Sequence, residues 1–459
     1  MLKPYDGYKG TDQLWLNSVP KHWDMIKTKY LFSERSSKGF PDEPLLVASQ
    51  NMGVVPKGVY GNRTVEATKD LHLLKLVKVG DFVISLRSFQ GGIEYAYYQG
   101  IISPAYTVMI PKSFITANYF RHLGKSKTFI ELLQMCVTGI REGQNVDYNK
   151  LKNYHLPVPP QEEQDQITKY LDWQTSKINT LIKAKKKQIE LLKEQKQAVI
   201  NKAVTKGLDD TVPMKESSIE WLGRVPEHWE VNRLKKFCKI NASISNLAKA
   251  YSDNDELVFL PMENVTVDGK IDCSQKRPFK DVKSGYSSFA KNDVVIAKIT
   301  PCFENGKGAC LDELETEIGY GTTEFITIRA YNSMLPRYLY LVTMTQHFRL
   351  NGEEQMTGSA GQKRVPTDFV ANFIQGIPPI EEQRVIVTYL KEKTALIDKA
   401  IAVIKKEIEL VSEYKTSLIS SVVTGKVDVR DVIVPDFVVV EDEVSDADEG
   451  LEVDVDDSN

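Results

Sequence analysis

The sequence has few cysteines and no long apolar run. No stretch reaches the roughly 18 consecutive apolar residues that a membrane-spanning helix needs, and residues 1–14 have no apolar core of a secretion signal. The five cysteines are odd in number and scattered, with no Cys-x-x-Cys pair. This pattern disfavours a disulfide framework or a cysteine zinc site. We therefore expect a protein of the reducing cytoplasm that has no membrane partner.

Known catalytic motifs are also missing. There is no Gly-x-x-x-x-Gly-Lys-Ser/Thr loop, no Gly-x-Gly nucleotide turn, no Asn/Asp-Pro-Pro-Tyr and no His-Glu-x-x-His. The six histidines are dispersed, and we interpret His22 and His228 as packing residues. We expect no catalytic residue, no metal site and no bound cofactor in this chain, which favours a binding protein over an enzyme.

Positive charge is missing from one end of the chain. Residues 436–459 contain eleven acidic residues and no Lys or Arg. The net charge of the whole chain is −3, so the first 435 residues carry +8. A basic body with an acidic tail is common among nucleic-acid binders, although unrelated proteins share it. We expect the tail to be a disordered solubilising segment, with competition against DNA for the basic surface as the sharper alternative.

The most informative feature is an internal repeat. Two motifs occur twice. The first is Trp-Leu-x-x-Val-Pro-x-His-Trp, which we call the Trp motif. The second is Pro-Pro-x-Glu-Glu-Gln, in which x is Gln in the first copy and Ile in the second, and which we call the Pro-Pro motif. The matching segments are 15–23 with 221–229, 80–84 with 292–296, and 159–164 with 378–383. The offset rises from 206 through 212 to 219, so the second copy has about thirteen extra residues. Three collinear matches predict a duplicated domain.

Each Pro-Pro motif opens a long amphipathic pattern. The proline pair prevents helix before it, and the following glutamates suit the positive end of a helix dipole. Apolar residues then recur in steps that fit a seven-residue repeat over about 44 residues, or roughly 65 Å of helix. Two ordinary core helices are the alternative to a coiled coil. The predicted seam is Ile167, Leu171, Ile178, Ile182, Ile189, Leu192 and Val199 with Ile386, Leu390, Ile397, Ile401, Ile408, Val411 and Leu418.

The order of these patterns predicts the architecture. Strand-like runs near 81–86, 106–110, 294–297 and 325–328, with helix-like stretches near 117–136 and 335–350, indicate mixed globular halves. We expect an α+β fold in which two mixed α/β domains are separated by two long antiparallel coiled-coil helices, with a pseudo-two-fold internal repeat. The expected segments are a first domain at 13–158, a first helix at 159–207, a linker at 208–220, a second domain at 221–377, a second helix at 378–426 and an acidic disordered tail at 427–459.

The doubled, ordered set of motifs resembles the specificity subunits of Type I restriction-modification systems. Inner segments are also similar to the target-recognition domains of that family, namely 86–95, 102–108, 297–307 and 321–325. The resemblance covers about residues 13–430, and the acidic tail departs from it.

The resemblance implies a division of labour. Two target-recognition domains each read half of an interrupted, asymmetric sequence of double-stranded DNA, and the paired helices set the gap. The chain itself binds no cofactor. Two methyltransferase subunits use S-adenosylmethionine to methylate adenine, and restriction/translocase subunits use ATP and Mg²⁺ to move and cleave DNA.

Candidate DNA-binding residues follow from side-chain chemistry. Arg suits guanine, Gln and Asn suit adenine, and cations hold phosphates. The candidates are Arg87, Gln90, Arg141, Gln144, Asn145, Lys298, Asn305, Lys307, Gln362, Lys363 and Arg364. For each one, an ordinary solvated surface side chain is the alternative. The lysines at 183 and 185–187 are expected to be a solvated helix exterior, with phosphate contact as the alternative.

Two other functions stay open. The chain could be a self-contained DNA-modifying enzyme with an unrecognised motif, which predicts activity of the purified chain alone. It could also be a coiled-coil scaffold protein, which predicts that charge reversal at Arg87 or Lys307 has no effect on any DNA-linked activity.

Overall fold

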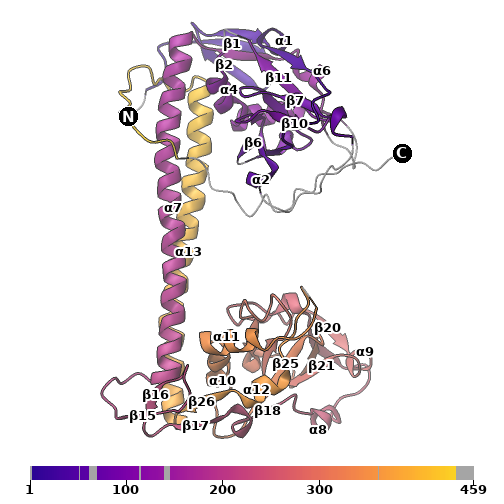
Figure 1. Cartoon of the computed structure of the whole chain (residues 1–459), viewed down its shortest axis with the longest axis vertical. Coiled ribbons are helices and arrows are strands. Elements are labelled where there is room, and N and C mark those ends of the chain that lie inside the picture. The colour runs from indigo at the N-terminus through magenta and orange to yellow at the C-terminus, as the bar shows by residue number, and fades with distance from the viewer. Residues whose placement is uncertain are drawn as a thin grey trace. The chain divides into compact units, whose positions relative to one another are not determined.

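The structure, a computed structural model, describes residues 3–50, 52–60, 70–112, 115–138, 145–359 and 361–440. The chain forms two compact units. The first comprises residues 1–187 with 404–459, and the second comprises residues 188–403. Each unit therefore holds one globular half and sections of both long helices (Figure 1). The division into six segments stays a prediction.

The first globular half combines short strands with short helices. Its strands are β1 Tyr8–Gln13, β2 Leu16–Pro20, β3 Asp24–Lys27, β4 Phe32–Arg35, β5 Leu46–Ser49, β6 Gly53–Pro56, β7 Lys75–Val77, β8 Phe82–Ile84, β9 Glu94–Tyr95, β10 Gly100–Ile102, β11 Thr107–Pro111, β12 Val137–Thr138, β13 Asn145–Val146 and β14 His155–Val158. Its helices are α1 Thr28–Leu31, α2 Lys57–Tyr60, η1 Leu71–Leu73, α3 Ser88–Gly91, α4 Ala117–Gly124, α5 Lys127–Met135 and α6 Tyr148–Leu151.

The second globular half has the same kind of composition. Its strands are β15 Met214–Glu216, β16 Arg224–Pro226, β17 Glu230–Arg233, β18 Cys238–Ile240, β19 Glu256–Leu260, β20 Lys276–Pro278, β21 Ser287–Ala290, β22 Val294–Ala297, β23 Gly308–Cys310, β24 Ile318–Gly321, β25 Phe325–Ala330 and β26 Ile374–Ile377. Its helices are η2 Leu234–Lys236, α8 Ser245–Ala248, η3 Met262–Asn264, α9 Phe279–Val282, η4 Leu311–Glu313, α10 Pro336–Thr343, α11 Gln346–Glu354 and α12 Thr367–Asn372.

The central sheets show the duplication. The first half has an antiparallel sheet in the order β4-β11-β8-β9, and the second half has the equivalent order β18-β25-β22-β23. All four predicted strand runs lie in these two sheets. The second half also has a four-stranded sheet, β20-β19-β24-β21, in which β19 and β24 are parallel. The fold is thus α+β with an internal repeat, as the sequence predicted.

Each predicted helical stretch near 117–136 and 335–350 is two helices instead of one. The first breaks between α4 and α5, where Ser126 caps α5 by accepting a hydrogen bond from the Phe129 amide. The second breaks between α10 and α11, where Thr345 accepts from the Phe348 amide. Ser and Thr stabilise helix N-termini in this way because their oxygens accept from otherwise unpaired amides. The apolar spacing alone did not reveal these breaks.

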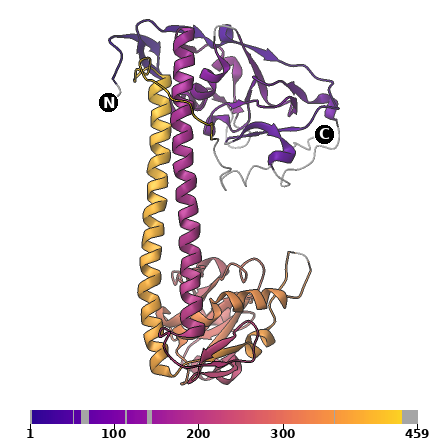
Figure 2. The ribbon, with the colours of Figure 1, turned by 60° about the vertical axis from the view of Figure 1, so that its left-hand side comes forward.

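The two long helices are α7, Gln161–Lys206, and α13, Ile380–Val423. All fourteen residues of the predicted seam are buried or half-buried. Within the first unit, the last turns of α13 lie beside the first turns of α7 (Figures 1 and 2). There the Lys415 ammonium donates to the Asn179 amide oxygen at 3.0 Å, and Lys185 pairs with Glu407 at 2.5 Å.

The same antiparallel pairing continues in the second unit. There the Lys196 ammonium donates to both carboxylate oxygens of Asp398, at 2.7 and 2.8 Å. As the residue number rises along α7, the number of its partner on α13 falls, so the two chains run in opposite directions. The predicted antiparallel pair of long helices is confirmed within each unit.

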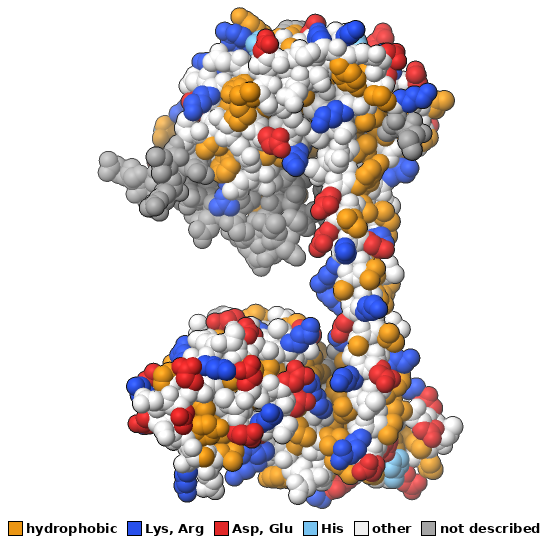
Figure 3. Space-filling model, turned by 180° about the vertical axis from the view of Figure 1, so that it is seen from behind, with side chains coloured by type: hydrophobic (Ala, Val, Ile, Leu, Met, Phe, Trp, Pro, Cys, Tyr) orange, Lys and Arg blue, Asp and Glu red, His pale blue; other side chains and the backbone are white. Residues whose placement is uncertain are grey.

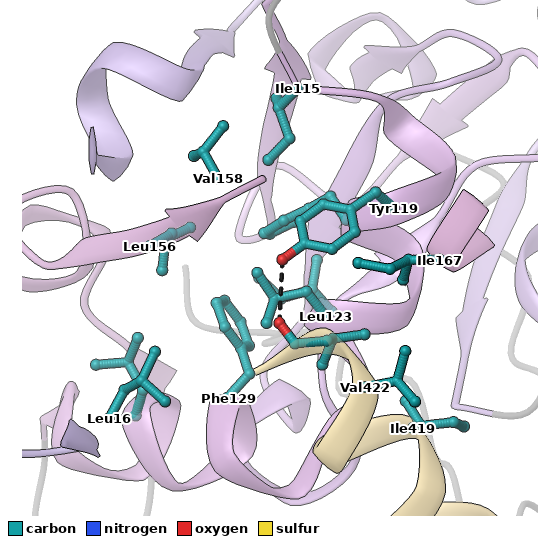
Figure 4. Close-up of a cluster of buried hydrophobic side chains, with 14 of the residues drawn as sticks. Leu16, Ile115, Tyr119, Leu123, Phe129, Leu156, Val158, Ile167, Ile419 and Val422 are labelled. Atoms are coloured by element: carbon teal, nitrogen blue, oxygen red, sulfur yellow. Dashed lines mark hydrogen bonds between the residues drawn. The ribbon is translucent and has the colours of Figure 1, made fainter. Parts of the chain in front are cut away.

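The core of the first unit closes over the end of α13. Tyr119 of α4 is fully buried, and its hydroxyl donates to the carbonyl oxygens of Val423 at 3.1 Å and Pro157 at 3.3 Å. Figure 4 shows this ring among Leu123, Phe129 and Ile167, with its hydroxyl pointing at the last turn of α13. The final carbonyls of a helix have no partner within the helix, so a buried helix end needs such a donor.

The second unit closes over the end of α7 in the same way. Tyr338 of α10 is fully buried and its hydroxyl donates to the Val204 carbonyl oxygen at 3.2 Å. The Gln375 amide donates to the same oxygen at 2.9 Å. Burial raises the pKa of both tyrosines well above the usual value, so both hydroxyls stay protonated and able to donate.

The beginning of the predicted tail is ordered. Residues 429–440, which we call the C-terminal strap, run along α7: the Gln166 amide donates to the carbonyls of Val429 at 2.9 Å and Val432 at 2.7 Å. Farther along, the Val440 amide donates to Ser176 at 3.0 Å, and Asn179 donates to the Val440 carbonyl at 2.7 Å. The expectation of a disordered tail is therefore wrong for residues 427–440, and residues 441–459 lie outside the described part. Among the described residues, no helix is long and apolar enough to cross a membrane.

The two buried tyrosines provide a matched test of helix-end capture. We expect Tyr119→Phe to lower the free energy of unfolding by about 1–3 kcal/mol, because the Val423 and Pro157 carbonyls lose their donor in a dry core. Tyr338→Phe should cost less, because Gln375 still donates to Val204. Urea unfolding of the two variants measures the difference. An equal or larger loss in Tyr338→Phe would contradict this account.

Candidate nucleic-acid interface

In the first unit, the Trp motif and the Pro-Pro motif meet at the start of α7. Glu163 of the Pro-Pro motif is 5% exposed, and its carboxylate accepts from the Trp23 indole at 2.9 Å and from the Tyr5 hydroxyl at 2.5 Å. The His22 ring lies 2.7 Å from the other carboxylate oxygen. His22 therefore belongs to packing at the helix start, as the sequence suggested. This contact fixes the globular half on the helix.

The second unit repeats this contact. The Trp229 indole donates to Glu382 at 3.1 Å, and the His228 ring lies 2.7 Å from the other oxygen of the same carboxylate. No residue takes the place of Tyr5 among the hydrogen bonds of Glu382 in the described chain. Glu382 is accordingly more exposed than Glu163, at 29% against 5% of the side chain.

The glutamine of each Pro-Pro motif joins the long helix to the next short helix. Gln164 accepts from the Thr116 amide at 2.8 Å, just before α4, and donates to the Pro159 carbonyl. Gln383 accepts from the Leu335 amide at 2.8 Å, just before α10. Both glutamines are buried. The motif therefore places α4 and α10 at the same position relative to the helix start.

The aspartates of the second repeated segment, 80–84 with 292–296, anchor the strands that lead to the candidate loops. Asp81 is 2% exposed and forms a two-pronged ion pair with Arg35, at 2.8 and 3.0 Å. Asp293 forms the equivalent pair with Arg329, at 2.7 Å for both contacts. Arg35 comes from β4 and Arg329 from β25, so the two copies supply the cation from different strands. In each case the aspartate fixes the strand, β8 or β22, whose far end carries candidate DNA-binding residues.

In the first unit these candidates lie on α3. Arg87 precedes α3 and Gln90 is within it, and both side chains are exposed. Gly91 and Gly92 follow Gln90 directly, at a place where a glycine pair could let the backbone approach DNA. Instead they pack against protein: a Cβ on Gly92, whose φ is +87°, would lie 2.3 Å from the Gly124 carbonyl oxygen. Gly92 therefore seats α3 on the end of α4, and Gly91 packs against Gln50.

Strand β13, which carries another candidate, lies next to α3. Asn145 is exposed on β13, and β13 contacts α3. The Asn145 amide oxygen accepts from the Thr138 hydroxyl at 3.3 Å. The fold thus brings Arg87, Gln90 and Asn145 to one region of the surface. Arg141 and Gln144 lie outside the described residues.

In the second unit, two candidate loops are joined by backbone hydrogen bonds. The Thr300 amide donates to the Lys363 carbonyl at 3.0 Å, and the Val365 amide donates to the Lys298 carbonyl at 2.8 Å. The two segments carry six of the candidates between them. Asn305, Gln362 and Lys363 are exposed, and Lys298, Lys307 and Arg364 are half-buried.

Arg364 already has a protein partner. Its guanidinium holds Glu324 with contacts of 2.9 Å from both Nε and Nη2. The hydrogen bond from Arg364, together with the charge of Lys298, lowers the pKa of Glu324 below its usual value. Arg364 therefore ties its loop to the turn that leads into β25.

The charge of the surface does not mark an interface by itself. On the face shown in Figure 3, basic and acidic side chains are mixed over the second unit. Within the described ranges, no group of His, Cys, Asp or Glu has an arrangement that could hold a metal ion. The candidate sites are therefore small polar loops, with one such loop cluster in each unit.

Comparison with known proteins gives the family. The model of the Type I restriction modification DNA specificity domain matches residues 28–191 and again 226–410. The two matches cover most of the chain and coincide with the internal repeat.

Individual relatives agree with this match. The specificity subunit of the Type I restriction enzyme EcoAI from Escherichia coli is 40% identical over 178 residues, which are 38% of this chain and 29% of that subunit. The chain thus spans less than a third of that relative's length. The MjaVIII specificity subunit from Methanocaldococcus jannaschii is 26% identical over 90% of this chain and 95% of its own.

A solved structure shares the fold. It comes from work described as the structural basis underlying complex assembly and conformational transition of the type I R-M system. The two chains superpose with a TM-score of 0.64 at 14% identity, covering 89% of this chain and 99% of the other.

The second glutamate of each Pro-Pro motif, Glu163 or Glu382, should contribute a different amount to the stability of the protein. We expect Glu163→Ala to destabilise the protein more than Glu382→Ala, because Glu163 leaves Trp23 and Tyr5 without an acceptor. Each buried donor left unpaired costs about 1–3 kcal/mol. Thermal unfolding of the two variants, with wild type beside them, measures the order. The reverse order would show that Tyr5 contributes nothing to this contact.

Proposed function

Since this chain belongs to the Type I restriction-modification DNA specificity family, we propose that it is a non-catalytic subunit that reads an interrupted DNA sequence. Each unit recognises one half of the target through its polar loop cluster. The long helices join the two readers and fix the gap between the half-targets.

The observation that carries this proposal is the doubling of one scaffold with two different loop chemistries. The Trp motif, the Pro-Pro motif and the central sheet are equivalent in both units. The loop side chains are not: Arg87 and Gln90 stand where the second unit has Lys298, Asn305 and Lys307. Base edges are distinguished by such side chains, so different sets read different bases. The target is therefore asymmetric.

Catalysis belongs to partner subunits in this proposal. Two methyltransferase subunits, which use S-adenosylmethionine, bind the paired long helices and modify one adenine on each strand. Restriction/translocase subunits that use ATP and Mg²⁺ join the same assembly. The complex acts on double-stranded DNA in the cytoplasm.

The proposal predicts a methylation pattern that depends on this chain. When the chain is expressed with its partner methyltransferase in a host that has no such system, sequencing should detect N6-methyladenine in a two-part, asymmetric motif on both strands. Omitting the chain should abolish it. Methylation that persists without the chain would remove the reading role, and methylation by the purified chain alone would make it an enzyme.

Single loop variants should relax one half of the motif at a time. We expect Arg87→Ala to loosen base preference only in the first half-target, at a cost of about 1–3 kcal/mol against the wrong base. Asn305→Ala should loosen only the other half-target. The same methylation sequencing gives the result. Equal loss at all positions in both variants would indicate that these side chains hold the backbone and do not read bases.

A further inference from the structure

Arg349 of α11 is a cation buried beneath the loop that carries Asn305 and Lys307. It is 8% exposed, and its Nη1 donates to the Phe303 carbonyl oxygen at 2.9 Å. Its guanidinium carbon lies 4.9 Å from the centre of the Phe303 ring. A Cβ added to Gly306 would lie 3.9 Å from both Nε and Nη2 of this guanidinium. Arg349 therefore forms the floor of the turn at residues 301–306.

No carboxylate pairs with this cation in the part of the chain that the structure describes. Its other hydrogen bond goes to the Met344 sulfur at 3.5 Å, and its Nε has no partner among the described residues. Burial lowers the pKa of Arg349 to about 10, so the guanidinium is still charged at pH 7. Taking a cation out of water without an anion beside it costs stability. A cost of this kind is typical of a functional site.

The internal repeat shows that the fold does not require a cation at this position. The offset of 219 relates Arg349 to Ile130 of α5, and it relates the neighbouring Phe348 to Phe129. Ile130 is half-buried, so an apolar side chain fills the same place in the first unit. The reason for an arginine therefore lies in the loop above it and not in the packing of the helix.

The first unit holds its own candidate loop at the same backbone position with a different cation. The offset of 212 that relates β8 to β22 also relates Gly91 to Phe303. The Lys125 ammonium donates to the Gly91 carbonyl oxygen at 3.1 Å, as Arg349 donates to the Phe303 carbonyl oxygen. Lys125 stands at the position of Met344, so the two units reach the equivalent carbonyl from different residues. A contact made twice by different side chains indicates a requirement of the loop itself.

We propose that Arg349 is a positioning residue for base recognition in the second half-target. Its guanidinium fixes the Phe303 carbonyl, and with it the turn from which Asn305 and Lys307 reach the DNA. Arg349 itself touches no base. The inference rests on the proposed function and adds a residue that sets specificity from beneath the loop.

Arg349→Met tests the proposal in the complex with the methyltransferase, because methionine is unbranched and has neither the charge nor the donors. The measurement is kcat/KM for methylation of the target duplex and of duplexes with one changed base in either half-target. A good base contact discriminates about 5- to 150-fold against the wrong base. We expect Arg349→Met to reduce this discrimination about tenfold in the second half-target and to leave the first half-target unchanged.

The stability of the same variant separates positioning from a purely structural role. The Gly306 amide also donates to the Phe303 carbonyl, at 2.9 Å, so this oxygen keeps a donor when Arg349 is replaced. Because the variant also removes a buried charge that has no anion, we expect its urea midpoint to equal or exceed that of wild type. A variant that does not fold, or that loses stability while its rates fall equally on all duplexes, would overturn the proposal. Arg349→Lys, which keeps the charge and a donor, should restore part of the discrimination.

Arg337→Met is the matched control in the same unit. Arg337 lies on α10 and pairs with Asp312 and Glu313, which follow β23 at its far end from the loop. Its replacement should leave the discrimination in both half-targets at the wild-type value. Unchanged discrimination in Arg349→Met, or equal losses in Arg337→Met and Arg349→Met, would refute the positioning role. A wild-type complex without any preference for its target would instead refute the proposed function.

Discussion

The structure depends on the hydrogen bonds that the last carbonyls of the two long helices accept. Helix α7 begins in the first unit and ends in the second, and α13 begins in the second unit and ends in the first. Each end is buried in a globular half, where its last carbonyls would be costly without donors. Tyr119 and Tyr338 supply those donors. Each globular half is therefore completed by a helix that starts in the other half of the sequence.

The sequence revealed the elements whose chemistry is local. The Pro-Pro pairs and the heptad steps predicted the two long helices, because helix starts and helix periodicity depend on neighbouring residues. The repeat predicted two equivalent sheets. The contact of Glu163 with Trp23 was not predicted, although both residues lie in motifs that the sequence shows twice. Two motifs repeated at a similar separation in both copies were the available signal that they meet in space.

Other features depend on partners that the sequence does not place together. Gly92 is required by the close approach of the Gly124 carbonyl, which comes from a distant part of the sequence. Arg364 looked like a DNA ligand and is held by Glu324, about forty residues away. The tail looked disordered because its composition is acidic, yet α7 presents Gln166, Ser176 and Asn179 to its backbone. Amide and hydroxyl side chains on an otherwise solvated helix face gave no pattern from which a bound strap could be predicted.

Residues near both ends of the described chain meet in the first unit. The Asp428 amide donates to the Lys3 carbonyl at 2.9 Å, and the two residues form a short antiparallel bridge. Joining these ends would turn the backbone into a closed ring made of two similar arcs, each with a globular half and a long helix. Such a ring has no intrinsic first half. Opening it in the stretch between α7 and β15 would give a chain that starts with the second half and keeps the contacts of Tyr119 with Val423 and of Tyr338 with Val204.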